Sequence, residues 1–183
     1  MKGKEFYTSN SPISFIDLEM TGLEGFKHEI VEIGLVKASQ PDLSIIEKWE
    51  IKVRPESVLL ADPDSLKISG YDIEKWKDAV KLSDAMRTLS EKVKDTILAG
   101  FNVATDYAFL DAAVTKTGIP LDFHKRVLDV NSYAVAKLGY EWHEVGLGGL
   151  SKRLDIVHEN HHTALADATA CYKIYRKLRK DFT

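Results

Sequence analysis

Two carboxylates end the first apolar stretch of this chain. Asp17 and Glu19 lie in Ser-Phe-Ile-Asp-Leu-Glu-Met-Thr-Gly, residues 14–22. Because side chains alternate faces along a strand, these two acids point the same way and repel each other unless a cation neutralises them. Carboxylate oxygens are hard ligands that suit Mg2+ or Mn2+. An isolated Asp-x-Glu pair also fits a strand end whose acids face water, so a metal site needs further ligands.

Three more polar residues could complete such a site. Asp106 directly follows a predicted strand, where open α/β sheets gather their ligands, although an acid that opens a helix is as often a helix cap. Further along, His162 precedes Asp167 by five positions. If Thr163 caps the last helix, Asp167 faces the sheet from its early turns, and His162 stands in the lead-in, within reach of solvent and substrate.

Length and composition narrow the classes of protein. The 183 residues fit one domain, 1–183 with a core of about 12–180, that needs no disulfides. The formal net charge of −3 gives no global attraction to nucleic acid or to an anionic membrane, so a polyanion must be held locally. The lone Cys171 is expected to be a buried structural thiol. With no secretory signal in residues 1–10 and no apolar run of membrane-spanning length, we expect a cytoplasmic protein.

The periodicity of apolar residues predicts an α/β fold. The predicted strands are 13–20, 29–38, 45–53, 96–101 and 127–130. Four helices are predicted: one that Ser83 caps, one that begins at Thr105 or Asp106, and two that cover 132–138 and 163–179. A short helical turn is expected after residues 61–64, and a turn at 146–149. Three meandering strands followed by alternating strands and helices imply a layered structure with a mixed sheet.

Taken in order, three motifs resemble the His-containing (DEDDh) branch of the DEDD-type exonucleases. The motifs are residues 15–22, Asn102-x-x-x-Asp106 and His162-x-Ala164-x-x-Asp167, and together they span nearly the whole chain. That branch includes the proofreading epsilon subunit of bacterial DNA polymerase III, ribonuclease T and oligoribonuclease. The resemblance implies a ribonuclease H-like fold, a five-stranded mixed sheet flanked by helices. It also implies a metal-dependent 3′–5′ exonuclease that releases nucleoside 5′-monophosphates from single-stranded ends.

The family's site residues carry over onto four acids and one histidine: Asp17, Glu19, Asp106, Asp167 and His162. The acids are expected to hold two divalent cations, Mg2+ or Mn2+, with Glu19 also counted as catalytic. Such ions provide a nucleophile at neutral pH and neutralise charge that builds on the phosphoryl oxygens. His162 is expected to be the general base, because an unperturbed imidazole titrates at about pH 6.5 and can take a proton from water. His161 is expected to have no catalytic task.

The resemblance also implies five substrate-binding residues: Met20, Thr21, Leu23, Phe101 and Asn102. Leu23 is expected to wedge against the terminal base, and Ile68 lies in a segment that resembles the family's segment near that base. Phe101 departs from the family pattern, in which His commonly precedes the Asn. Since a phenyl ring cannot donate a hydrogen bond, a polar contact there is replaced by stacking or lost.

We expect the protein to bind the 3′ ends of single-stranded DNA or RNA, with DNA slightly favoured. We do not expect it to bind a membrane. The alternatives are an oligoribonuclease-like RNA exonuclease and a catalytically silent fold-mate that binds nucleic acid. Four clustered acids argue against a silent protein, because they repel one another without metal. The basic run at 173–180 either guides a strand or is a solvated helix face. The chain ends four residues after Arg179, so we expect a free-standing nuclease without a polymerase-tethering tail.

Overall fold

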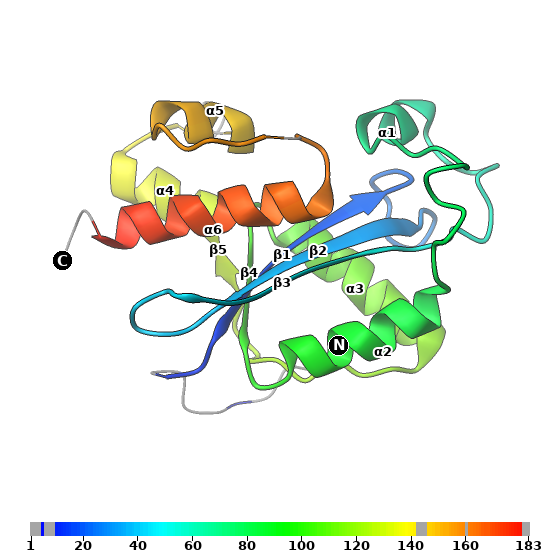
Figure 1. Cartoon of the computed structure of the whole chain (residues 1–183), viewed down its shortest axis with the longest axis horizontal. Coiled ribbons are helices and arrows are strands. Elements are labelled where there is room, and N and C mark those ends of the chain that lie inside the picture. Colours follow the sequence, from blue (N-terminus) through cyan, green and yellow to red (C-terminus); the bar gives the residue numbers. More distant parts are fainter. Residues whose placement is uncertain (1–4, 6–9, 142–145, 160, 181–183) are drawn as a thin grey trace.

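The structure, a computed structural model, describes residue 5 and residues 10–141, 146–159 and 161–180. Its centre is a five-stranded sheet with strand order β3-β2-β1-β4-β5 (Figure 1). The strands are β1 (Ile13–Met20), β2 (Ile30–Ala38), β3 (Ile45–Lys52), β4 (Ile97–Gly100) and β5 (Leu128–Asp129). The pairs β1–β2 and β2–β3 are antiparallel, whereas β1–β4 and β4–β5 are parallel. The predicted meander and mixed sheet are therefore confirmed.

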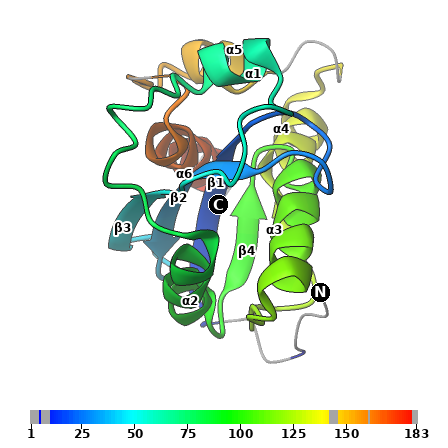
Figure 2. The same ribbon diagram turned by 90° about the vertical axis from the view of Figure 1, so that its right-hand side faces the viewer.

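Helices cover both faces of this sheet (Figures 1 and 2). They are α1 (Pro63–Ile68), α2 (Leu82–Val93), α3 (Ala104–Thr117), α4 (Val130–Leu138), α5 (Leu147–Arg153) and α6 (Ala164–Lys180). One hydrophobic core lies between the sheet and α4, α5 and α6, and a second lies between the sheet and α2 and α3. Helix α1 lies near the loop that follows β1, and the backbone of Asp62 bonds that of Thr21 in this region.

The central strand β1 contributes to both cores, which decides where its acids point. Phe15 packs in the first core, where its ring meets the ring of Tyr172 edge-on at a centroid distance of 5.5 Å. Ile16 and Leu18 pack in the second core. Because side chains alternate along a strand, Asp17 and Glu19 fall on the same face as Phe15. Both acids therefore emerge on the face that α6 covers.

Helix α6 comes closest to the sheet at Gly34. A Cβ atom built on Gly34 would lie 2.1 Å from the backbone carbonyl carbon of Ala164, the first residue of α6. Only glycine permits this approach, because any side chain would push the helix away. Gly34 is also the register partner of Asp17. The close contact thus brings the start of α6 next to the acids of β1.

The turn predicted at 146–149 is wrong, because this stretch opens α5. Gly146 is the N-cap of this helix, and Gly148 and Gly149 lie within it. Glycine has a low helix propensity, but Leu150 is fully buried in the first core and holds α5 against α6. Tertiary packing therefore overrides local preference here.

Two predicted helix starts also need correction. Ser83 does not cap α2, which begins at Leu82 after Lys81 and has no side-chain capping bond. Helix α4 begins at Val130, two residues before the predicted start, because Asp129 Oδ1 accepts a hydrogen bond of 2.6 Å from the N–H of Ser132 and caps the helix. The other elements end within two residues of their predicted bounds.

The basic run on α6 serves the fold. Lys173 Nζ donates to the carbonyl oxygen of Val157 at 2.8 Å, and Lys177 Nζ donates to that of Leu154 at 2.6 Å. These bonds fasten the segment that leads from α5 to α6. Lys173 and Lys177, committed to carbonyl groups, are poorly placed to guide a nucleic-acid strand, and they are not simply solvated either.

Cys171 lies inside α6. The Cys171 thiol is free and 1% exposed, as expected, and burial raises its pKa well above the usual value. A thiol that stays protonated is a poor nucleophile.

Among the described residues, no helix combines the length and the apolar character needed to cross a membrane.

Candidate active site

The end of β1 extends beyond its parallel neighbour. Only the first three residues of β1 pair with β4, so the backbone near Leu18 has no strand partner on that side. The N–H of Leu18 donates instead to Asp106 Oδ1 at 3.0 Å. Asp106 lies in the first turn of α3 and is 5% exposed. An otherwise unpaired backbone donor thus holds the Asp106 carboxylate beside the strand that carries Asp17 and Glu19.

The start of α6 brings the remaining predicted residues to the same place. Ligand atoms of Glu19, His162 and Asp167 all lie within 4.8 Å of one another. Asp167 is in the first turn of α6, and its side chain is 14% exposed. His162 is exposed and has a φ of 67°, which is uncommon for a residue other than glycine and marks a conformation held by its surroundings.

The carboxylates here are crowded, and burial raises the pKa of Asp17, Glu19 and Asp106. Burial, followed by repulsion from Asp106 and Asp167, raises the pKa of Asp17 well above its usual value. Burial and repulsion from Asp167 raise the pKa of Glu19 to about 8. Burial raises the pKa of Asp106 to about 7, although its own N–H and that of Leu18 act in the opposite direction.

This donor set fits a hard divalent cation. Within the described residues, no Lys or Arg forms an ion pair with any of the four carboxylates. Crowded carboxylates without a Lys or Arg partner become favourable when a divalent cation neutralises them, and carboxylate oxygens suit Mg2+ and Mn2+. The residues at the end of β1 and the start of α6 are therefore able to hold such ions.

Glu32 is a fifth carboxylate, which lies outside the three motifs. It is 2% exposed and lies opposite Glu19 in the register of β1 and β2. Burial raises its pKa to about 7, and the N–H of Ala164 donates a hydrogen bond to it. This bond ties the first residue of α6 to β2. A signal was available, because Glu32 is the lone acid in the apolar stretch 30–36.

His158 is a second such residue. Its Nε2 lies 2.6 Å from Asp167 Oδ1, and its side chain is 4% exposed. The ring of His158 also contacts that of His161, with 3.8 Å between the centroids. His158 stands nine residues before Asp167 and outside every motif, so the sequence held no signal for this pairing.

Residues predicted to bind substrate follow the carboxyl ends of β1 and β4. Leu23 is 78% exposed, and Met20 is partly buried at the end of β1. Phe101 is half-buried against the first core. Asn102 has a φ of 59°, and its Oδ1 accepts a hydrogen bond of 2.6 Å from Asn131 Nδ2. Leu23 and Asn102 are thus open to a ligand, and Phe101 is partly so.

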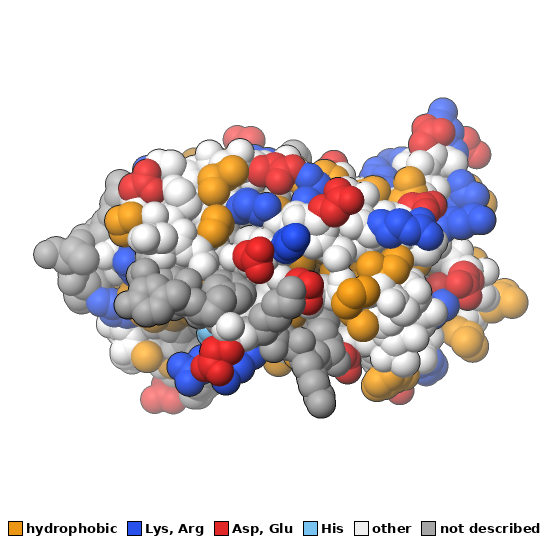
Figure 3. Space-filling view, turned by 90° about the horizontal axis from the view of Figure 1, so that it is seen from below, with side chains coloured by type: hydrophobic (Ala, Val, Ile, Leu, Met, Phe, Trp, Pro, Cys, Tyr) orange, Lys and Arg blue, Asp and Glu red, His pale blue; other side chains and the backbone are white. Residues whose placement is uncertain are grey.

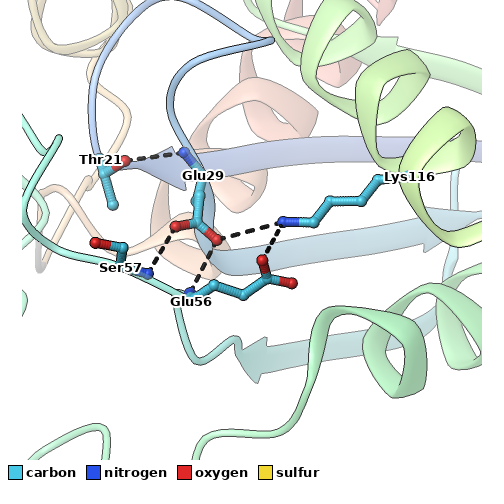
Figure 4. A network of polar contacts seen from close by, with 5 residues as sticks. All are labelled: Thr21, Glu29, Glu56, Ser57 and Lys116. Carbon is cyan, nitrogen blue, oxygen red and sulfur yellow. Dashed lines mark hydrogen bonds and ion pairs between the residues drawn. The ribbon is translucent and has the colours of Figure 1, made fainter.

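Thr21 and Glu29 brace the loop after β1 (Figure 4). Thr21 is buried, and its Oγ1 accepts a hydrogen bond of 2.9 Å from the N–H of Glu29. The Glu29 carboxylate accepts from the N–H of Glu56 at 2.9 Å and of Ser57 at 3.0 Å. Lys116 Nζ, from α3, lies 2.9 Å from Glu56 Oε2 and 3.8 Å from Glu29 Oε2. The polar atoms of Thr21 therefore shape the loop rather than face an open site.

The comparisons decide the family. The Exonuclease family model, RNase_T, matches residues 14–175. This chain belongs to the exonuclease family. The matched residues include all three motifs on which the DEDDh prediction rests.

Curated relatives of this exonuclease are much longer chains. It is 28% identical over 166 residues to the PolC-type DNA polymerase III of Bacillus subtilis and 30% identical over 165 residues to that of Latilactobacillus sakei. Each match covers 90% of this chain and 11% of the relative. The exonuclease thus spans about 11% of the length of these polymerases.

Solved structures establish the fold of the exonuclease. The nuclease domain of 3′hExo, a DEDDh family member bound to rAMP, superposes with a TM-score of 0.81 at 18% identity, over 94% of both chains. Escherichia coli Exonuclease I in complex with a dT13 oligonucleotide gives a TM-score of 0.78 at 18% identity, over 92% of this chain and 41% of that one. The predicted ribonuclease H-like fold is confirmed.

Proposed function

We propose that this exonuclease removes nucleoside 5′-monophosphates from the 3′ end of single-stranded nucleic acid, with two divalent cations, Mg2+ or Mn2+, as cofactors. The observation that carries the proposal is the buried group of carboxylates at the end of β1, next to His162 and without a Lys or Arg ion pair in the described part of the chain. Divalent cations, when bound, supply a reactive water at neutral pH and neutralise the phosphoryl oxygens.

Hydrogen bonds orient two of the proposed ligands in advance. The N–H of Leu18 holds one oxygen of Asp106, and His158 Nε2 holds one oxygen of Asp167. Outer-shell partners of this kind fix the direction of a carboxylate before a cation arrives. Asp17 and Glu19 are fixed differently, because both project from the same face of a buried strand.

His162 is the proposed general base. Its side chain is exposed and lies within 4.8 Å of ligand atoms of Glu19 and Asp167. An imidazole in this position can accept the proton of an attacking water at one ring nitrogen and release it to solvent. His162 therefore takes the role of base, and the acids take the role of ligands.

The terminal nucleotide is proposed to rest against apolar side chains at this edge. Leu23 is 78% exposed and Ile68 of α1 is 54% exposed, an arrangement that offers contact surface to an unstacked base. Phe101 and Asn102 follow β4 and would contact the same nucleotide. Contacts with the face of a base are tolerant of sequence, so we expect little preference for the identity of the terminal base.

Binding is expected to be local to the 3′ end. The net charge of the chain is −3, and on the face shown in Figure 3 the Lys and Arg side chains are interspersed with Asp and Glu. The face shown in Figure 3 therefore gives no extended basic track for a phosphate backbone. A cation-loaded carboxylate cluster is then the main attraction for the terminal phosphates.

DNA is proposed as the preferred substrate, with RNA as the alternative. The curated relatives are DNA polymerases, and Exonuclease I is described in complex with DNA oligonucleotides. The alternative has its own support, because 3′hExo is described bound to rAMP and another structural neighbour is described as a 3′-exonuclease in 3′-end recognition of a histone mRNA stem-loop.

A direct assay tests the proposal. Single-stranded DNA and RNA of matched sequence, labelled at the 5′ end, are incubated with Mg2+ or with chelator. We expect a ladder that shortens from the 3′ end, only with Mg2+, and faster on DNA. Asp17→Asn is the matched control for contaminating nucleases. If neither polymer shortens but either one binds, the chain is a silent fold-mate and the proposal is wrong.

A further inference from the structure

A second group of potential ligands lies beside the proposed active site. His158, His161 and Asp167 each offer a ligand atom, and the three atoms lie within 4.8 Å of one another. The two imidazole rings are in contact, with centroids 3.8 Å apart and an interplanar angle of 54°. His158 Nε2 is 2.6 Å from Asp167 Oδ1. This group differs from the cluster on β1 because two of its three ligands are nitrogens.

We propose that His158, His161 and Asp167 bind a transition-metal ion of the Zn2+ class, at a site distinct from the one that holds the catalytic cations. Imidazole nitrogens suit Zn2+, whereas Mg2+ strongly prefers oxygen ligands. Two histidines and one carboxylate form a ligand set that Zn2+ accepts, with water in the remaining position. The chemistry of the side chains therefore separates the two sites by the kind of ion that each selects.

One ring nitrogen of His158 has no hydrogen-bond partner among the described residues. Its side chain is 4% exposed, and within the described residues its Nδ1 is a buried polar atom without a hydrogen-bond partner. A buried polar atom in this state destabilises the folded protein, so it calls for a ligand or another explanation. With Nε2 facing Asp167, the unpartnered Nδ1 marks His158 as a side chain whose polar atoms the described residues do not fully satisfy.

A polar pocket gives solvent access to His158. It has a volume of about 350 Å³, and its lining includes Lys48, Glu50, Glu159 and Lys173 beside His158. Two acids and two lysines balance in charge, so the pocket does not repel a cation as a whole. His161 is exposed and completes the group from the solvent side. Neither His161 nor Asp167 lines this pocket, so the pocket opens beside His158 and not onto the whole group.

Asp167 links the two sites. It belongs both to the group with His158 and His161 and to the group with Glu19 and His162. An ion bound by the two histidines would also be coordinated by Asp167. The carboxylate cluster would then bind its own cations with lower affinity. We therefore expect Zn2+ to inhibit hydrolysis that depends on Mg2+. This consequence rests on the proposed function, whereas the binding of Zn2+ does not.

The test is calorimetric titration of Zn2+ into the full chain with Mg2+ in large excess. We expect the wild-type protein to bind Zn2+ under these conditions. His161→Ala removes an exposed ligand and should not disturb folding. It should weaken Zn2+ binding at least about 10–100-fold, the loss that outer-shell partners of metals already cause. His28→Ala, at a half-buried histidine of the loop after β1, is the matched control and should bind Zn2+ like wild type.

A second readout uses Co2+ in place of Zn2+, because the visible absorption of Co2+ is much stronger when the ion has four ligands than when it has six. The absorption should appear with wild type, bleach on addition of Zn2+, and be absent from His161→Ala. Equal Zn2+ affinity in wild type and His161→Ala would overturn the proposal. So would loss of Zn2+ binding in Asp17→Asn with full binding in His161→Ala, since the ion would then sit among the catalytic carboxylates.

Inhibition separates this proposal from the proposed function. Zn2+ should inhibit Mg2+-dependent hydrolysis by wild type at lower concentration than it inhibits His161→Ala. If the chain proved to have no nuclease activity, yet bound Zn2+ through His161, the proposed function would fail and the site would stand. If hydrolysis were present and Zn2+ binding did not depend on His161, the Zn2+ site would be wrong and the proposed function would stand.

Discussion

The backbone N–H of Leu18 donates a hydrogen bond of 3.0 Å to Asp106 Oδ1, and this bond joins residues 88 positions apart. It couples the end of β1 that extends beyond β4 to the first turn of α3. Asp106 therefore has a structural task as an acceptor and a proposed task as a metal ligand. The two tasks depend on different properties, the oxygen atom and the negative charge, so substitutions can separate them.

Asp106→Asn should separate these tasks. The amide keeps an oxygen for the Leu18 N–H but removes the charge, so we expect hydrolysis to fall by roughly 10²-fold or more while stability is kept or rises. Asp106→Ala also leaves the buried N–H unsatisfied, which costs about 1–3 kcal/mol of unfolding free energy. Urea unfolding and the oligonucleotide assay measure the two effects. Equal stability of the Asn and Ala variants would contradict the role of the hydrogen bond.

Burial of the acids, together with their mutual repulsion, should make the metal-free protein less stable as the pH rises. The pKa is about 8 for Glu19 and about 7 for Glu32, against an ordinary 4.5 for both. Between these values the folded protein holds protons that the unfolded chain has lost, so the free energy of unfolding should fall from about pH 5 to pH 8. Mg2+ should remove most of this slope, because it replaces the protons at the carboxylates.

Urea unfolding across this pH range, in chelator and in Mg2+, measures both slopes. Glu19→Gln is the matched variant, since it keeps the shape of the side chain and cannot ionise, so its slope in chelator should be shallower. A metal-free protein that is equally stable at both ends of the range would show that the carboxylates are not held together as described.

His162 should be needed for the rate and not for metal binding. Because its φ is 67°, a conformation that Asn tolerates better than Ala, His162→Asn is the cleaner substitution. We expect the rate to fall by about 10²–10⁴-fold, the usual contribution of a positioned base. Mg2+ affinity, measured by calorimetry, should stay close to that of wild type. The loss should far exceed that for His161→Ala measured with transition metals removed. If Mg2+ affinity collapses instead, His162 is a ligand and the base lies elsewhere.

The enzyme should require a free 3′ end. A 3′-terminal phosphate should slow degradation strongly, and duplex ends should resist unless they fray, because the proposed site receives an unstacked terminal nucleotide. A 5′-phosphorylated strand of the same sequence is the control and should be degraded normally. Attack on circular single strands at a comparable rate would mean an endonuclease.

Gly34→Ala should displace α6 and with it Asp167. The new methyl group would lie 2.1 Å from the backbone of Ala164, so the helix must move. We expect a loss of about 1–3 kcal/mol in unfolding free energy and a marked loss of hydrolysis. Gly149→Ala, in α5, is the matched control: no other atom lies within 4 Å of its new Cβ, and the helix should be unaffected or gain stability. Equal effects of the two substitutions would exclude a special role for the Gly34 contact.

Local rules acting along the chain were enough to predict much of this protein. Alternation along residues 13–20 placed Asp17 and Glu19 on one face, because adjacent residues of a strand have fixed directions. Short connections between the first three strands predicted the antiparallel meander. The order of the acidic motifs predicted the family and named the acids and the histidine that the structure brings together.

Only the tertiary structure showed what surrounds these residues. Glu32 enters the site because the register of β1 and β2 sets it opposite Glu19, and no spacing along the chain encodes a register. His158 meets Asp167 because the segment before α6 folds back onto that helix. Helix α5 forms over glycines because the burial of Leu150 outweighs their low helix propensity. In each case the deciding energy comes from contacts between segments that are distant in sequence, and patterns within one segment cannot express it.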